Sequence, residues 1–317
     1  MPEGPSVREF HGRCCRQLGA AVLRAAGGTR QVSVQRLEGR QLQQCQVSPH
    51  TPIDAPLLPP SPSPPRPGQP HCVFPQVHGK CLYLGFGDVR GADTGCPGSS
   101  GGSGDGAGSG GDTARDPRLW IRFHFGLFGR VRWDGLARAK RPNKRGDWAD
   151  PVPRLLLHFP GGHLLAFYSC RLCECGCPRP DPSTDILEPR FNTDQALLAL
   201  KAARPIGCIL LDQRHFSGLG NIIKNEALYL CGIHPWCLGS QLAADTQRQL
   251  LQRLLHFTHD WLDRKRRRQR LQHHIYQRAR CPRGHTVQRA QLGPPGGLSR
   301  PTWWCPVCQP LVPGPLG

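Results

Sequence analysis

Apolar residues recur at helical spacing near the start of the chain. Val7, Phe10, Cys14 and Leu18 are three or four residues apart, which places them on one face of a helix. Glu3 would lie in the first turn, where an acidic side chain is favoured. The chain is therefore predicted to begin with an amphipathic helix.

Short β-type segments follow this helix. Residues 76–86 alternate between apolar and polar side chains, which is typical of a half-buried strand. Residues 119–133, 154–160 and 163–170 are also rich in apolar residues, and a Gly-Gly turn separates two of these segments. Such short strands predict a β-sandwich or barrel behind the leading helix.

Helical periodicity dominates the second half of the chain. Residues 191–203 predict a helix capped by Asn192 or Thr193, and residues 206–232 predict a helix, a glycine turn and a second helix. Residues 240–268 predict a long amphipathic helix. Its apolar face would be formed by Leu242, Leu250, Leu254, Phe257 and Trp261.

These elements predict an α+β multidomain protein. We expect an N-terminal β-sandwich over residues 1–180, a helical domain over 181–272 and a small C-terminal β-hairpin unit over 273–317. Proline dominates residues 48–71, and Gly, Ser and Asp dominate residues 88–116. Neither segment can bury enough apolar surface to offset its ordering entropy, so both are expected to be disordered or extended.

The Pro-rich segment has a second notable feature. Codons for its Pro, Leu, Ser and Phe residues are rich in C and T, and the segment ends in Phe-Pro-Gln. This composition is that of a translated pyrimidine tract and splice acceptor. We therefore hypothesise that residues 47–76 are either a retained intron or a lineage-specific insertion.

Charge and cysteine content narrow the class of protein. The net charge is +19 with a pI near 9.8, which favours a polyanionic partner such as nucleic acid. There is no apolar run of signal-peptide or membrane-span length, so we expect no membrane association and a reducing setting. There, clustered cysteines among the 16 present indicate metal binding. The cluster CECGCP at 173–178 has the appearance of a second metal motif, but it lies in a Pro-rich connection and is interpreted as an incidental linker feature.

The C-terminal cysteines have the spacing of a metal site. Cys281 and His285 form a C-x-x-x-H pair, and Cys305 and Cys308 form a C-x-x-C pair. Two close pairs of this kind suit tetrahedral Zn²⁺, and four protein ligands make the zinc structural rather than catalytic. Arg300 would lie at the tip of the hairpin between the pairs, where it could contact a phosphate or a groove.

A glycine turn precedes a predicted helix in the middle of the chain. Gly218 and Gly220 permit a tight turn, and Asn221 begins the helix. A helix N-terminus offers free N–H groups and a positive dipole end, so this segment could bind a phosphate. A simple capped turn is the alternative.

The chain terminus itself can carry chemistry. If Met1 is removed, which the small Pro2 side chain favours, Pro2 presents a secondary amine beside the Glu3 carboxylate. Such an amine can form an iminium ion with an aldehydic carbon and so promote elimination. An α-amine with a pKa of about 7.7–8.0 is partly neutral near pH 7. Many proteins begin with Met-Pro, so an ordinary terminus is the alternative.

Several motifs occur together in a fixed order. The chain has PEGPSVREF at its start, HGKCLYLGF at 78–86, FGLFG at 125–129, LLDQRHFSGLGNIIKNEALY at 210–229 and a C-terminal WWCPVC. In combination they closely resemble the formamidopyrimidine-DNA glycosylase and endonuclease VIII family of base-excision repair enzymes. The resemblance covers nearly the whole chain outside the two low-complexity segments.

The resemblance implies a role for each matching residue. Pro2 matches the nucleophile that attacks C1′ of the damaged nucleotide, and Glu3 matches the neighbouring acid/base residue. Lys80 matches a lysine that contacts phosphate and assists proton transfer. Asn221 matches the phosphate-binding residue of a helix-two-turn-helix motif, and Arg300 matches the zinc-finger arginine that grips the DNA backbone.

Leu127 falls where relatives place a wedge residue, which fills the gap left by a flipped base. It could equally be a core leucine. We find no clear equivalents of the two other wedge residues that some relatives use, which would suit DNA bubbles, loops or single strands. The two low-complexity segments flank Lys80 and leave its position relative to Pro2 open.

The resemblance implies a bifunctional DNA glycosylase and abasic-site lyase. It would remove oxidised pyrimidines such as 5-hydroxyuracil and cut the strand by β,δ-elimination through a proline Schiff base. We expect a nuclear monomer that binds damaged DNA, with other repair proteins as potential partners. The basic run 264–270 could be a nuclear-import signal or a helix end. The alternatives are a non-catalytic zinc-finger DNA-binding protein and an RNA-binding or scaffold protein.

Overall fold

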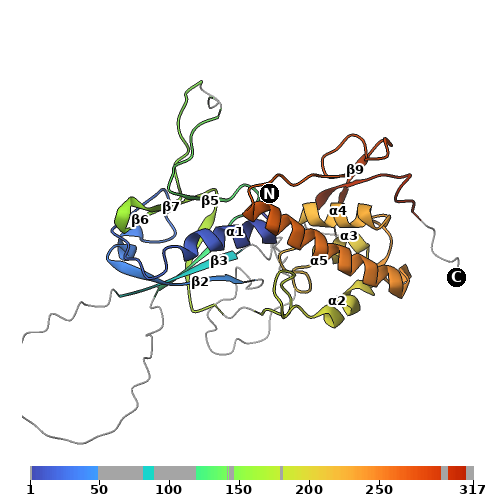
Figure 1. Ribbon diagram of the computed structural model, residues 1–317, viewed down its shortest axis with the longest axis horizontal. Coiled ribbons are helices and arrows are strands. Elements are labelled where there is room, and N and C mark those ends of the chain that lie inside the picture. Colours follow the sequence, from blue (N-terminus) through green and yellow to red (C-terminus); the bar gives the residue numbers. More distant parts are fainter. Residues whose placement is uncertain are drawn as a thin grey trace, which may run out of the picture.

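The computed structural model describes residues 2–48, 81–88, 119–140, 142, 146–178, 181–293 and 299–311. Over these residues a β-rich half and a helical half lie side by side, and the N-terminus lies between them (Figure 1). The segments predicted to be disordered fall outside the described residues except at their edges, where Ser48 and Asp88 end strands.

The predicted leading helix is present as α1, Gly4–Cys15. Val7, Phe10 and Cys14 are buried on its core face, as the spacing predicts. Leu18 does not extend this face, because the helix ends three residues earlier and the Leu18 side chain is 44% exposed. Glu3 is the N-cap residue rather than part of the first turn.

The first sheet has the strand order β2-β3-β4-β8, and all its pairs are antiparallel. Its strands are β2 Arg40–Ser48, β3 Cys81–Asp88, β4 Leu119–His124 and β8 Arg171–Cys175. β3 is buried on both faces rather than half-buried as predicted. Cys173 and Cys175 belong to β8, so the interpretation of this segment as a connecting linker was wrong.

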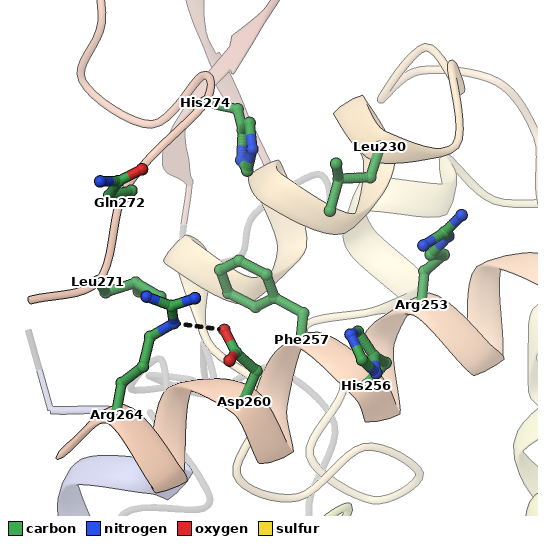
Figure 2. Close-up of a pocket in the computed structure, with 9 residues that line it drawn as sticks. All are labelled: Leu230, Arg253, His256, Phe257, Asp260, Arg264, Leu271, Gln272 and His274. Carbon is green, nitrogen blue, oxygen red and sulfur yellow. Dashed lines mark hydrogen bonds and ion pairs between the residues drawn. The ribbon is translucent and has the colours of Figure 1, made fainter. Parts of the chain in front are cut away.

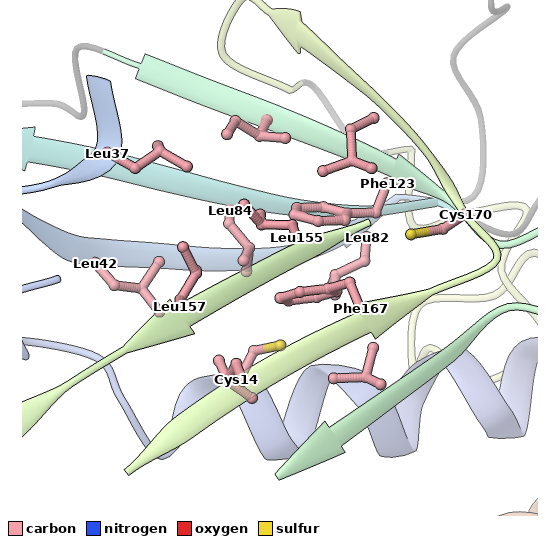
Figure 3. Packing of buried hydrophobic residues seen from close by; sticks show 14 of the residues in the cluster. Cys14, Leu37, Leu42, Leu82, Leu84, Phe123, Leu155, Leu157, Phe167 and Cys170 are labelled. Atoms are coloured by element: carbon pink, nitrogen blue, oxygen red, sulfur yellow. The ribbon is translucent and has the colours of Figure 1, made fainter. Parts of the chain in front are cut away.

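The second sheet has the order β1-β6-β7-β5, also antiparallel. Its strands are β1 Arg24–Ala26, β5 Arg130–Trp133, β6 Leu155–His158 and β7 Leu164–Tyr168. Side chains from both sheets and from α1 fill one apolar core (Figure 3). Phe123 and Phe167 stack there, with ring centroids 4.4 Å apart. The predicted β-sandwich with a leading helix is therefore confirmed.

The helical half contains four α-helices among the described residues: α2 Thr193–Leu200, α3 Ile206–Ile209, α4 Asn221–Leu230 and α5 Ala244–Arg266. Asn192 caps α2, since its side chain accepts a hydrogen bond from the Gln195 N–H at 3.0 Å. The apolar face predicted for the long helix is buried along α5, although Leu242 precedes the helix.

Strands β9, Gln288–Leu292, and β10, Arg300–Trp304, form the C-terminal hairpin. Arg300 opens β10 opposite Leu292, so it lies at the base of the loop and not at its tip as predicted. Short 3₁₀ helices span Val34–Leu37, Pro160–Gly162 and Gly239–Gln241. No helix in the described part of the chain is both long and apolar enough to cross a membrane.

Candidate active site and metal centre

The start of α1 meets the start of α4 at the boundary between the two halves. The Glu3 carboxylate accepts hydrogen bonds from the backbone N–H groups of Ile222 at 2.6 Å and Ile223 at 3.2 Å. The free N–H groups and the dipole of a helix N-terminus favour an anion at this position. Glu3 is completely buried, so α4 fixes the carboxylate directly next to Pro2.

Two glycines make this close approach possible. A Cβ at Gly220 would lie 2.3 Å from the Glu3 Cδ atom, a distance that no side chain can tolerate. The Gly4 N–H donates to the Gly218 carbonyl at 2.8 Å, and Gly218 adopts φ +87°, a conformation that glycine permits. The glycine turn predicted to bind a phosphate therefore also accommodates the Glu3 side chain.

An ion-pair network joins α1 to the segment that leads into the helical half. Arg8 donates to Asp185 at 2.7 Å and also to Glu188. Asp185 in turn accepts the Leu187 N–H at 2.9 Å. Breaking a buried pair of this kind leaves an uncompensated charge. The network therefore fixes α1 relative to residues 185–188, and sequence spacing alone gave no sign of it.

Lys224 is a fully buried lysine on α4, close to Glu3. Its Nζ donates to the Thr302 hydroxyl on β10 at 2.6 Å. Burial lowers the pKa of Lys224 to about 7; Cys208 and Glu3 oppose this shift, and the positive charge of Arg300 contributes to it. A lysine with this pKa changes charge near neutral pH, in direct connection with the site. The sequence analysis did not identify Lys224.

Other polar residues of α4 attach the C-terminal hairpin. The Asn221 amide donates to the Pro301 carbonyl at 2.8 Å, and the Asn225 amide oxygen accepts the Trp303 N–H at 2.9 Å. Asn221 is 3% exposed and lies beside Arg300 in the wall of a cleft. The structure thus brings together Glu3, Asn221 and Arg300, three of the predicted site residues.

This cleft has a volume of about 700 Å³. Its lining residues come from the β4–β5 loop, α4, the 276–279 segment and the hairpin: Leu127, Phe128, Asn221, Tyr276, Gln277, Arg278, Ala279, Arg289, Arg300, Pro301 and Trp303. Three arginines make it cationic, which suits a nucleic-acid backbone. Burial lowers the pKa of the Arg300 guanidinium, while Glu3 and Tyr276 oppose that shift.

The β4–β5 loop presents apolar side chains to the cleft. Leu127 is 42% exposed, which argues against the alternative of a core leucine, and the neighbouring Phe128 is 77% exposed. The sequence analysis did not identify Phe128. Pro2 is buried at the start of α1. Lys80 lies outside the described residues, so its predicted role stays a prediction.

The four predicted metal ligands converge on one point. The His285 Nδ1 lies 3.7 Å from the Cys281 Sγ, 3.7 Å from the Cys305 Sγ and 3.3 Å from the Cys308 Sγ, and the Cys281 and Cys308 sulfurs are 4.0 Å apart. Bonds of about 2.0–2.3 Å in a tetrahedral zinc site separate the ligand atoms by roughly 3.5–3.8 Å. The arrangement therefore fits a structural zinc ion.

Hydrogen bonds prepare this site for a cation. Burial opposes ionisation of Cys281, but the backbone N–H groups of Arg283 and His285 stabilise its thiolate and lower its pKa to about 6. Zinc binds the thiolate form. The ion would connect the 281–285 turn to the end of β10, the strand that begins with Arg300.

A second pocket, of about 260 Å³, lies between the end of α4, the middle of α5 and residues 271–274 (Figure 2). Within it the Arg264 Nε donates to Asp260 at 2.7 Å. Lys265 also pairs with Glu9, at 3.3 Å. Arg264 and Lys265, the first two residues of the basic run, therefore make intramolecular ion pairs. Glu3 does not line this second pocket.

Comparison with known proteins agrees with this geometry. The model of the formamidopyrimidine-DNA glycosylase H2TH domain matches residues 180–266. Human endonuclease 8-like 2 is 42% identical over 327 aligned residues, covering 98% of this chain and 97% of the relative. The chain belongs to the endonuclease 8-like family of DNA glycosylases. The family resemblance and the expected enzyme class of the sequence analysis are confirmed.

Solved structures of formamidopyrimidine-DNA glycosylases have a similar fold. Formamidopyrimidine-DNA glycosylase of Lactococcus lactis bound to DNA containing an AP site is 16% identical, with a TM-score of 0.62 and coverage of 98% of this chain and 100% of that one. A complex of the same enzyme with DNA containing an oxidised pyrimidine has a TM-score of 0.58 at 18% identity, with the same coverage. These endonuclease 8-like and formamidopyrimidine-DNA glycosylase proteins thus have in common the β-sandwich, the helical domain and the C-terminal hairpin.

Proposed function

We propose that this endonuclease 8-like protein removes oxidised pyrimidines such as 5-hydroxyuracil from DNA and then cuts the strand by β,δ-elimination, with Pro2 as the nucleophile. The observation that carries the proposal is the contact between Glu3 and the N-terminus of α4. Two backbone N–H groups hold the Glu3 carboxylate next to Pro2. An ordinary chain terminus has no reason for such a buried, fixed carboxylate.

In this mechanism the Pro2 amine attacks C1′ after removal of Met1. The new N–C1′ bond replaces the bond to the base, which leaves with a proton, and opening of the sugar gives an iminium ion. The iminium accepts the electron pair of the C2′–H bond, so the 3′ phosphate is eliminated and a second elimination releases the 5′ phosphate. Glu3 would exchange protons with the sugar and the leaving group.

The N-terminus of α4 lies at this site, where its N–H groups and its dipole stabilise the Glu3 carboxylate. Lys224 lies within the same electrostatic environment. Lys80 would supply a further phosphate contact and assist proton transfer. Lys224 is fully buried, so it would act on Glu3 and Arg300 through its charge, whereas Lys80 would contact the DNA itself.

DNA binding would use the cationic cleft. Arg300 and Asn221 lie together in its wall, where they can contact backbone phosphates, and the net charge of +19 supplies salt-dependent affinity. Leu127 would enter the stack in place of the flipped nucleotide. Single-stranded and bubble DNA are included as substrates, because no partner base then needs replacing.

A zinc ion would cross-link the hairpin without taking part in the chemistry. Its ligands would be Cys281, His285, Cys305 and Cys308. The protein would act as a monomer in the nucleus, where its substrate is found. Removal of oxidised pyrimidines is consistent with the Lactococcus lactis enzyme, which is solved with DNA containing an oxidised pyrimidine and also with DNA containing Fapy-dG.

Borohydride trapping tests the proposed function. The correctly processed protein is incubated with 5-hydroxyuracil DNA or abasic DNA, and borohydride reduces any Schiff base to a stable adduct. We expect a covalent adduct that Pro2→Thr abolishes, while Pro2→Thr retains DNA binding. DNA binding without any adduct from the processed protein would favour the alternative of a non-catalytic zinc-finger DNA-binding protein.

A further inference from the structure

A second cluster of metal-ligating side chains lies on the other side of the molecule from the hairpin, between α1 and the edge strand β2. It consists of His11, Cys15 and Cys45, whose ligand atoms all lie within 4.8 Å of one another. Nitrogen and sulfur ligands in this combination are those that zinc prefers. Neither the glycosylase chemistry nor the C-terminal metal centre uses these residues.

Two features of the backbone create the cluster. His11 and Cys15 are four residues apart on α1, so they lie on one face of the helix. Leu42 and Cys45 would lie on opposite faces of a regular strand, but the register shifts between Leu42 and Gln44. This β-bulge turns Cys45 toward the face covered by α1. The thiol is thereby placed beside His11.

The histidine ring contacts both cysteines. Its Nε2 lies 2.9 Å from the Cys45 carbonyl oxygen, to which the Nε2–H can donate. The Cys15 Sγ lies 3.5 Å from Nε2 and 3.8 Å from Nδ1, so a metal ion held by Nδ1 requires the Cys15 side chain to turn toward that nitrogen. Metal-bound histidines commonly donate their second N–H to a carbonyl in this way.

We propose that His11, Cys15 and Cys45 form a second metal site that binds a zinc-class divalent cation. Binding releases the two thiol protons to solvent, and the thiolates and the imidazole nitrogen occupy three coordination positions. Cys14 is completely buried in the apolar core of the sandwich (Figure 3), although its thiol interacts with that of Cys45, and we assign the fourth position to a solvent molecule. Because β2 is an edge strand, the ion would connect α1, the helix that follows Pro2, to the edge of the sandwich.

Metal analysis of the full-length protein tests this proposal. The protein is purified with Zn²⁺, freed of loosely bound metal by gel filtration, and assayed for zinc per chain by mass spectrometry. We expect two equivalents in the unaltered protein and one in Cys15→Ser, in Cys45→Ser and in His11→Asn. The matched control is Cys177→Ser, an exposed cysteine outside both clusters, which should retain two.

Cobalt substitution identifies the ligands directly. In the Co²⁺ protein, Cys15→Ser should weaken the sulfur-to-metal absorption, while Cys177→Ser leaves the spectrum unchanged. This readout does not depend on DNA binding or catalysis, so failure of the proposed function would not affect it. A single zinc equivalent in a folded, unaltered protein would overturn the proposal, and so would a Cys15–Cys45 disulfide in protein purified under reducing conditions.

Discussion

The two halves of the molecule differ in what they bury. Apolar side chains fill the sandwich core, and the described part of this half buries few polar residues, among them Glu3. The helical half and the hairpin bury many more, and four of them are consecutive or nearly so on α4: Asn221, Lys224, Asn225 and Glu226. One half supplies the reactive terminus, and the other contains the polar groups that hold it in place.

The contacts of helix α4 explain why the helical half buries so many polar residues. Its N-terminus binds Glu3, Asn225 and Lys224 bind β10, and Glu226 accepts the N–H groups of Ile275 and Tyr276 at 3.1 and 2.8 Å. Buried polar groups are costly when unpaired. The groups just named are hydrogen-bonded, whereas the Asn221 Oδ1 has no partner among the described residues, and the paired groups fix the geometry. A single helix therefore sets the position of the carboxylate, the hairpin and one wall of the cleft.

The largest loss of activity is expected when the N-terminus of α4 can no longer bind the Glu3 carboxylate. In Gly220→Ala the new Cβ would displace the carboxylate, because it would lie 2.3 Å from the Glu3 Cδ. Loss of a positioned acid/base group costs about 10²–10⁴-fold in rate, so we expect a fall in lyase rate of at least about 100-fold, measured by nicking of abasic DNA.

Gly12→Ala is the matched control for this variant. Gly12 lies in α1, a Cβ there meets nothing within 4 Å, and alanine favours a helix. Unchanged nicking by Gly220→Ala would show that α4 does not position Glu3 for catalysis.

Because Lys224 is buried on α4, the stability of the folded protein should depend on pH. Its pKa is about 7 in the folded protein and about 10.4 in an unfolded chain. Between about pH 7 and pH 10.4, Lys224 is protonated in the unfolded chain but neutral in the folded protein. Its contribution to the free energy of unfolding therefore increases as pH rises. The free energy of unfolding of the unaltered protein, minus that of Lys224→Met, should increase by about 1–3 kcal/mol between pH 7 and pH 9.5.

Denaturant unfolding at several pH values measures this difference, and subtraction removes the contributions of all other groups. A difference that stays constant with pH would mean that Lys224 keeps its proton throughout and that burial does not control its charge.

Asn225→Ala tests whether α4 holds the hairpin. The variant leaves the buried Trp303 N–H without its acceptor, which costs about 1–3 kcal/mol. Hydrogen exchange should accelerate at the amides of β10. Asn192→Ala is the control, because it removes the cap of α2 and should accelerate exchange there instead. Equal protection of β10 in both variants would contradict the account.

The smallest effect on stability is expected at the cleft surface. Leu127 is substantially exposed, so Leu127→Ala should change the free energy of unfolding by no more than about 0.5 kcal/mol while it weakens activity on duplex DNA more than on single strands. Leu165→Ala, in the sandwich core, should cost about 2–5 kcal/mol. A comparable loss of stability in Leu127→Ala would show that Leu127 is a core residue and not a wedge residue.

Sequence patterns predicted most of the elements and the residues that occur in local motifs. The four predicted ligands of the C-terminal centre form two short pairs, so their spacing in the sequence was sufficient to identify them. The apolar faces of α1 and α5 were visible for the same reason, although periodicity did not show where α1 ends before Leu18. The roles of Pro2 and Glu3 depended on family resemblance, because two adjacent residues carry no spatial information.

Long-range packing produced the features that the sequence did not reveal. The pKa of Lys224 results from complete burial between α4 and β10, which no spacing indicates. The cluster of His11, Cys15 and Cys45 depends on a β-bulge and on the position of α1 over an edge strand. Assignment of Cys173 and Cys175 to strand β8 likewise required the pairing with β4.

The location of the trapped adduct tests the central claim most directly. After borohydride reduction with abasic DNA, the protein is digested and the modified peptide is sequenced by mass spectrometry. The account predicts the sugar remnant on the nitrogen of Pro2, in a peptide that lacks Met1. A remnant on a lysine side chain, with Pro2 unmodified, would contradict it.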